Sequence, residues 1–183
     1  MTTAVVVGSP RRRSRTYEAA VNVVVELTAA PPDLALDLAE FGPRLLEPDD
    51  PEVSNAVEAV TGHDLVVFAS PTYKASYTGL LKVFLDRFPP GALDGVTTVP
   101  LMLGGHWRHG LVAELLLKPV LVELGSTAPT RGLFLLEGEL TGETLDAWLA
   151  VARSQVTATT TAGSRATRRG VTSRAGVRAA RRD

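Results

Sequence analysis

The sequence of 183 residues contains no cysteine. This absence excludes a disulfide framework and any metal site built on thiolate ligands, and it is typical of proteins from a reducing compartment. No apolar run approaches the roughly 20 residues that a membrane-spanning helix needs. The first residues, MTTAVVVGSP, enter a strand pattern without the basic segment and long apolar stretch of a secretory signal. We therefore expect a soluble, cytoplasmic protein with no membrane partner.

Basic residues are concentrated at one end of the chain. Residues 163–183 hold seven of the 19 basic residues and one of the 20 acidic residues, which leaves a formal charge of −7 on residues 1–162. This Arg-rich segment has no aromatic residue for base stacking and no apolar periodicity. We interpret it as a flexible, solvated C-terminal tail and expect no nucleic-acid partner; an acidic protein partner is the alternative. Residues 1–162 are long enough for one domain with one core.

Apolar patterning within residues 1–162 predicts alternating strands and helices. Short apolar runs bounded by Gly, Pro or polar residues indicate strands at Thr3–Gly8, Leu34–Ala39, Asp64–Ser70, Val96–Leu103 and Pro129–Leu136. Apolar residues at helical spacing indicate helices at Arg15–Leu27, Glu52–Thr61, Thr78–Phe88, Leu111–Leu124 and Glu143–Val156. This alternation predicts an α/β fold with a parallel sheet covered on both faces. One such five-stranded order, 2-1-3-4-5, puts the reversal of strand order between the first and third strands.

The loop after the first predicted strand suits a phosphate group. In such a sheet, ligands bind beyond the carboxyl ends of the strands, where the strand order reverses. The segment GSPRRRSRT, residues 8–16, offers hydroxyls, cations and the N–H groups of a helix N-terminus. Its single glycine suits a monophosphate better than a pyrophosphate. The alternative is an ordinary helix cap at Ser14 beside solvent-facing arginines.

The loop after the third predicted strand suits a flat ring. Pro71 stiffens the turn, Tyr73 offers an aromatic face, and the backbone of Pro71–Lys74 can present N–H and C=O groups to a planar heterocycle. The alternative is a simple end of the strand with an ordinary half-buried tyrosine.

The loop after the fourth predicted strand, LGGHWRHG at residues 103–110, contains a pair of glycines. Gly104 and Gly105 allow the backbone to approach a ligand edge closely. His106 and His109 raise the possibility of a metal site, but no convergent acid or cysteine accompanies them. We therefore expect no metal.

Together, the segments GSPRRRSRT, SPTYKASYTGLLKVFLD and LGGHWRHGLVAELLLKPVLVELG resemble the NAD(P)H-dependent FMN reductase family. The likeness covers about residues 3–137 and is greatest to the branch that supplies reduced flavin to two-component monooxygenases, including the alkanesulfonate-associated reductases. The resemblance implies an α/β fold, a flavodoxin-like three-layer sandwich with a five-stranded parallel sheet in the order 2-1-3-4-5. It also implies an FMN phosphate bound by Ser9, Arg11, Ser14, Arg15 and Thr16. It also implies an isoalloxazine ring along Pro71, Thr72, Tyr73 and Lys74 on one side and Gly104 and Gly105 on the other.

The resemblance implies an oxidoreductase that uses FMN and NAD(P)H and that has a monooxygenase partner. Hydride would pass from C4 of the nicotinamide to N5 of FMN, so we expect no catalytic acid, base or nucleophile from the protein. Two alternatives remain: an FMN-containing reductase of quinones, azo dyes or metal oxyanions, and a flavodoxin-type electron carrier without a nicotinamide site.

Two further features bear on flavin handling and assembly. The alkanesulfonate-associated branch tends to carry Tyr or His in the helix after the double glycine, where this chain has Leu115. Since Leu115 offers no ring and no hydrogen bond, we hypothesise that FMN is retained rather than released. The helices predicted at 78–88 and 111–124 are too apolar for the single stripe of a monomer, so we expect a homodimer or homotetramer.

Overall fold

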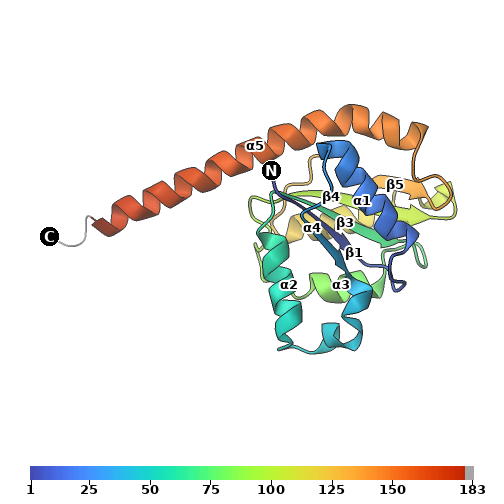
Figure 1. The fold of residues 1–183 in the computed structure, drawn as a ribbon, viewed down its shortest axis with the longest axis horizontal. Helices are drawn as coiled ribbons and strands as arrows, with labels where there is room; N and C mark the ends of the chain where they lie inside the picture. Colours follow the sequence, from blue (N-terminus) through green and yellow to red (C-terminus); the bar gives the residue numbers. More distant parts are fainter. Residues whose placement is uncertain (180–183) are drawn as a thin grey trace.

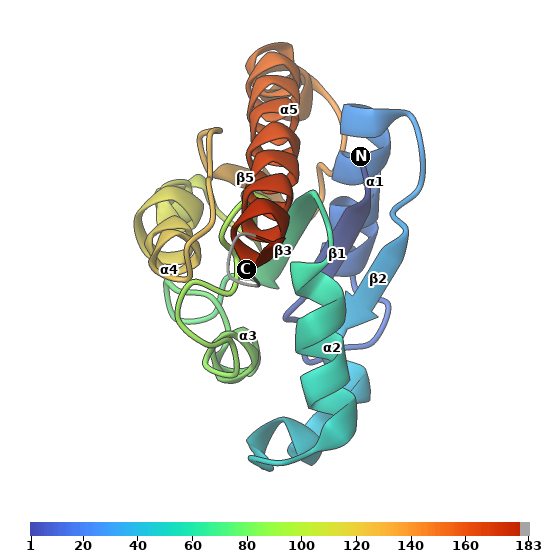
Figure 2. The ribbon, with the colours of Figure 1, turned by 90° about the vertical axis from the view of Figure 1, so that its left-hand side faces the viewer.

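The computed structural model describes residues 1–179, with side chains described as far as residue 161. Five parallel strands form one sheet in the order β2-β1-β3-β4-β5, which confirms the predicted fold class. The strands are β1 Thr3–Val7, β2 Leu34–Asp37, β3 Leu65–Pro71, β4 Thr97–Gly104 and β5 Leu133–Leu136. Figure 2 shows β2 and β5 towards opposite sides of the molecule, as befits the two edge strands.

Helices cover both faces of the sheet. The α-helices are α1 Arg15–Thr28, α2 Pro51–Thr61, α3 Gly79–Leu85, α4 Lys118–Glu123 and α5 Glu143–Ala179. Four shorter turns of helix are η1 Leu38–Glu40, η2 Gly42–Leu46, η3 Trp107–His109 and the π-helical η4 Ala113–Leu117. Figure 1 shows α1 and α5 above the sheet and α2 and α3 below it, with the far part of α5 projecting beyond the body.

Alternating side chains of the strands form two separate cores. Val5 and Val67 belong to the cluster with α1 and α5, whereas Val6 and Phe68 belong to the cluster with α2, α3, η4 and α4. All four side chains are fully buried. Burial on both faces explains why β1, β3 and β4 read as continuous apolar runs rather than as alternating patterns.

The ends of two predicted strands were wrong. The second strand stops at Asp37 instead of Ala39, because the Asp37 carboxylate accepts the N–H of Ala39 and starts η1. The fifth strand begins at Leu133 instead of Pro129, because the N–H of Gly132 donates to Oε2 of Glu114 at 2.5 Å rather than to a neighbouring strand.

The fourth predicted helix is not a single α-helix. It begins with the wide turn η4 and continues as α4 only from Lys118. Pro119 has no N–H to donate to the carbonyl of Leu115, and its ring would crowd that carbonyl in a regular α-helix. We attribute the π turn to this residue.

Helix α5 continues to Ala179, so the predicted end at Val156 was wrong. The role predicted for the tail at 163–183 depends on side chains that lie outside the described residues and stays a prediction. Within residues 1–179, no helix combines the length and apolarity needed to cross a membrane.

Candidate flavin site

The loop after β1 is held against β3 and α3 by one backbone and one side-chain hydrogen bond. The N–H of Gly8 donates to the carbonyl of Ala69 at 2.8 Å, and Oγ1 of Thr78 donates to the carbonyl of Gly8 at 2.5 Å. A Cβ at Gly8 would lie 2.5 Å from Cβ of Leu81. Only glycine allows the loop to approach α3 this closely.

The hydroxyls predicted to bind phosphate lie at the start of α1. Ser9 is buried and accepts the N–H of Arg11 at 3.2 Å, while the Arg11 side chain is exposed. Ser14 caps α1 by accepting the N–H of Tyr17 at 3.3 Å, and Thr16 is buried in the first turn. The capping role considered for Ser14 is therefore confirmed, and it places the amino end of α1 beside the loop.

The Arg15 side chain bonds to the residue that directly follows β5. Its Nε and Nη2 donate to the carbonyl of Glu137 at 3.3 and 3.1 Å, and its Nη1 lies 3.3 Å from Oε2 of Glu18. The N–H of Glu137 in turn donates to the carbonyl of Gly104 at 3.1 Å. Arg15 thus joins the loop after β1 to the end of β4, a connection across 122 residues of sequence.

The loop after β3 is a tight turn that exposes Tyr73. The backbones of Tyr73 and Ser76 exchange hydrogen bonds of 2.9 and 3.1 Å, and Lys74 and Ala75 between them have φ values of 52° and 63°. Two consecutive positive φ angles are typical of a type I′ turn. Tyr73 is 48 % exposed, so the ring predicted to face the flavin is open to a ligand.

Thr72 connects this turn to the third loop and leaves one polar atom unpaired. Its N–H donates to the carbonyl of Leu103 at 2.6 Å, but its buried Oγ1 has no hydrogen-bond partner among the described residues. A Cβ at Gly104 would lie 3.3 Å from that oxygen and 2.8 Å from Cζ of Phe134. An orphaned hydroxyl beside a side-chain-free backbone fits a ligand with polar ring atoms, such as FMN.

His106 makes its side-chain hydrogen bond within the third loop. Nδ1 of His106 accepts the N–H of Arg108 at 3.0 Å and starts η3. Across the side chains described, no three His, Cys, Asp or Glu residues converge into a group that could hold a metal ion.

Sequence reasoning missed three residues that position these loops. Thr78 orients Gly8, and Asp37 accepts the N–H of Arg13 at 2.8 Å. The carbonyl of Glu137 accepts hydrogen bonds from the guanidinium of Arg15. Thr78 had a usable signal, since a threonine directly before an apolar helical run is a common N-cap. Glu137 acts through its backbone, so its side-chain type carries no signal.

A doubly wound parallel sheet with three joined loops at its switch point defines a flavodoxin-like nucleotide-binding protein. The family is more specific than the fold. Residues 1–140 match the family described as NADPH-dependent FMN reductase, and the chain belongs to that family.

The chain is also similar to individual reductases of known name. The chain is 38 % identical over 86 residues to FMN reductase (NADPH) of Escherichia coli K12, a match that covers 47 % of this chain and 45 % of that protein. It is 33 % identical over 124 residues to the NADH-dependent FMN reductase SfnF of Pseudomonas putida, covering 63 % and 67 % of the two chains. The apo crystal structure of the NADH:FMN oxidoreductase EMOB superposes with a TM-score of 0.76 at 28 % identity, covering 88 % of this chain and 89 % of that one.

Proposed function

We propose that this protein is an NAD(P)H:FMN oxidoreductase. The observation that carries the proposal is the joining of the loops after β1, β3 and β4 at the switch point, around the unpaired hydroxyl of Thr72. Membership of the FMN reductase family supports it. Bound FMN would supply the redox chemistry by accepting a hydride from the nicotinamide.

The protein's part is to bind and orient. In this proposal Ser9, Arg11, Ser14 and Thr16 bind the phosphate together with the amino end of α1. Arg15 adds positive charge there while its guanidinium keeps the loops after β1 and β4 in register through Glu137.

The ring would be held by the other two loops. Pro71, Thr72, Tyr73 and Lys74 would line one side, with the Thr72 hydroxyl donating to or accepting from the ring. The backbone of Gly104 and Gly105 would line the other side. The loops on both sides of a ring in this place would exclude water from its reacting atoms. No acid or base from the protein is needed there.

Oxidation of NADPH and of NADH, with and without added FMN, tests this function. We expect FMN-dependent oxidation of at least one donor by the purified protein. FMN binding without donor oxidation would identify an electron carrier instead. Donor oxidation that requires a quinone, azo dye or metal oxyanion even with FMN bound would favour the other reductase class.

We further propose that a flavin-dependent monooxygenase receives the reduced flavin, as the sequence resemblance implies. Leu115 bears on how the transfer occurs. This side chain is 62 % exposed on η4 and offers no ring or polar atom. We expect FMN to be retained, with sub-micromolar binding in fluorescence titrations and parallel double-reciprocal plots. Weak binding with intersecting plots would instead show that FMN is exchanged as a substrate.

A homodimer or homotetramer is proposed because η4 and its neighbours expose apolar side chains. Leu111, Leu115, Leu116 and Val122 are all exposed over this short stretch. A cluster of this kind is unfavourable in water unless another surface covers it. Light scattering at micromolar concentration should give a mass above that of one chain, and a monomer mass would contradict the proposal.

A further inference from the structure

A hollow of about 450 Å³ opens beside the three loops, along the free edge of the sheet. Its floor is the start of β5, and one wall is the outer face of α5. Trp107 and Gly110, from the segment after β4, close the other side. The lining residues are Trp107, Gly110, Arg131, Gly132, Leu133, Phe134, Thr144, Ala147, Trp148, Val151, Ala152 and Gln155. None of the functions assigned above uses this hollow.

Two indole rings line the hollow, and each contacts a neighbouring residue. Nε1 of Trp148 donates to the carbonyl of Arg131 at 2.8 Å, which ties α5 to the floor. Trp107 lies 5.6 Å from the ring of Phe134, centroid to centroid. Indole faces bind flat heterocycles by stacking, so the hollow suits a planar aromatic ligand.

Arg131 is the single charged residue among the described residues that line the hollow. The nearby acid, Glu114, is already occupied, because it accepts the N–H of Gly132 at 2.5 Å and the ammonium of Lys118 at 2.9 Å. Burial alone would raise the pKa of Glu114, but these two donors and the charge of Arg131 outweigh it and lower the pKa. On a body with a formal charge of −7, the described lining of the hollow carries one cation and no acid, which favours an anionic ligand there.

The position of the hollow relates it to the candidate flavin site. Leu136 pairs with Gly104, where the flavin ring is proposed to end, and Arg131 precedes Leu136 by five residues. At about 3.3 Å per residue, Arg131 lies at most about 16 Å from that point along the sheet edge. Two riboses and a pyrophosphate separate the bases of an extended nicotinamide dinucleotide by a similar length.

We propose that this hollow binds the adenosine half of NADPH. The inference rests on the proposed NAD(P)H-dependent function and adds a place and a specificity to it. The adenine stacks on Trp148 and Trp107, and Arg131, at the end remote from the flavin, pairs with the 2′-phosphate. The backbone of Phe134 faces the open edge, since that of Glu137 faces β4, and offers a donor and an acceptor to the adenine.

A binding experiment on the flavin-free protein tests the proposal without turnover. The chain has only two tryptophans, and both line the hollow, so tryptophan fluorescence reports on this site. Adenosine 2′,5′-bisphosphate should quench it saturably. Val151, 57 % exposed on α5, lines the hollow, whereas the neighbouring exposed Ala150 does not. Val151→Glu should weaken binding at least about tenfold and Ala150→Glu by less than about twofold.

The 2′-phosphate contact is tested by Arg131→Gln. This change should weaken the binding of adenosine 2′,5′-bisphosphate about tenfold. It should weaken the binding of 5′-AMP by less than about threefold, because 5′-AMP lacks the 2′-phosphate. Equal losses for the two nucleotides would overturn the assignment of Arg131.

Kinetics with a truncated donor separate this proposal from the function on which it rests. Reduced nicotinamide mononucleotide carries the hydride but no adenosine. Val151→Glu should lower kcat/KM for NADPH at least about tenfold and leave kcat/KM for the mononucleotide within about twofold. If the wild-type protein reduces FMN but Val151→Glu lowers kcat/KM equally for both donors, the hollow proposal fails and the function stands. If neither donor reduces FMN, the function fails, and the nucleotide titration still decides whether the hollow binds adenosine phosphates. A lower assembly mass for Val151→Glu in sedimentation, with unchanged nucleotide binding, would assign the hollow to a subunit contact instead.

Discussion

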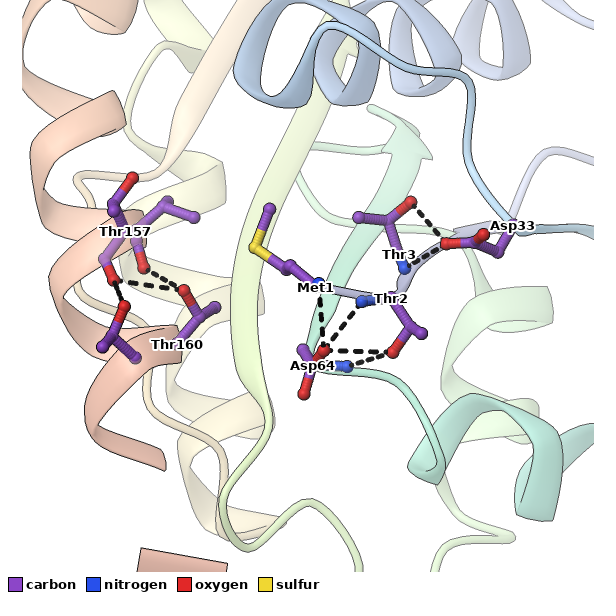
Figure 3. Close-up of polar contacts among 9 residues, drawn as sticks. Met1, Thr2, Thr3, Asp33, Asp64, Thr157 and Thr160 are labelled. Atoms are coloured by element: carbon purple, nitrogen blue, oxygen red, sulfur yellow. Dashed lines mark hydrogen bonds and ion pairs between the residues drawn. The ribbon is translucent and has the colours of Figure 1, made fainter. Parts of the chain in front are cut away.

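The two ends of the sheet carry similar polar residues and use them differently. At the amino end, the N–H groups of Thr2 and Thr3 each donate at 2.7 Å to a carboxylate, Asp64 and Asp33 respectively, and both threonine hydroxyls join the same pairs (Figure 3). At the carboxyl end, the Thr72 hydroxyl has no partner among the described residues, and Tyr73 lies half exposed. The polar groups named at the first end hold strands together, whereas Thr72 and Tyr73 at the second end remain available for a ligand.

The largest effect on this contrast is expected from Gly8→Ala. The new Cβ would lie 2.5 Å from Cβ of Leu81 and force the loop after β1 away from α3. The free energy of unfolding should fall by about 3 kcal/mol, and FMN binding should be lost. Gly62→Ala is the control, since a Cβ there would meet only carbonyl oxygens at 3.4 Å or more and the φ of Gly62 is −79°. Urea denaturation and flavin titration measure both, and an unchanged Gly8→Ala protein would refute the close packing.

Arg11→Ala should affect the phosphate end of the ligand alone. Loss of one charge-assisted hydrogen bond is expected to weaken FMN binding about 10- to 30-fold. The affinity for riboflavin, which has no phosphate, should fall by less than about twofold. Arg153→Ala, which removes an arginine paired with Glu26 on the helical layer, is the control. Similar losses for both flavins would mean that Arg11 does not contact the phosphate.

Thr72→Val distinguishes a hydroxyl kept for a ligand from one that is merely unpaired. Removal of a buried unsatisfied hydroxyl should stabilise the flavin-free protein by about 1 kcal/mol. The same change should weaken FMN and riboflavin equally, by about tenfold, because the contact is to the ring. Thr130 also has a buried hydroxyl without a partner among the described residues, on the loop before β5. Thr130→Val should stabilise the protein similarly and leave flavin affinity unchanged; a parallel loss of affinity would show that neither effect is local.

The smallest effect is expected at the amino end, from Asp33→Asn. The N–H of Thr3 donates to this carboxylate and lowers its pKa, against the weaker opposing effect of burial. A carboxylate with a lowered pKa stabilises the fold above its unfolded pKa of about 3.9 and loses that contribution as the pH falls through the folded value. The difference in unfolding free energy between wild type and variant should be constant from about pH 6 to 8 and shrink below about pH 4. A difference that stayed constant down to about pH 3 would contradict this role of the Asp33 carboxylate.

The sequence was sufficient for the strands because β1, β3 and β4 are buried on both faces and leave uninterrupted apolar runs, whereas the strand order was implied by the family resemblance. It was not sufficient for the wide turn η4, since a proline can end, kink or widen a helix and local pattern does not choose among these. The contact of Arg15 with Glu137 joins residues far apart in sequence and ends on a carbonyl, which every residue type possesses. The hollow arises from the outer face of α5, whose residues read as ordinary helix surface.

The close approach of Gly132 to η4 has a consequence for protein engineering. A Cβ at Gly132 would lie 2.5 Å from the backbone nitrogen of Glu114, so the floor of the hollow tolerates no side chain at this position. The opposite wall is different, because Ala147 and Val151 stand on a helix surface and can be exchanged without disturbing a backbone. A mutant library intended to change what the hollow accepts should therefore randomise α5 and leave Gly132 untouched.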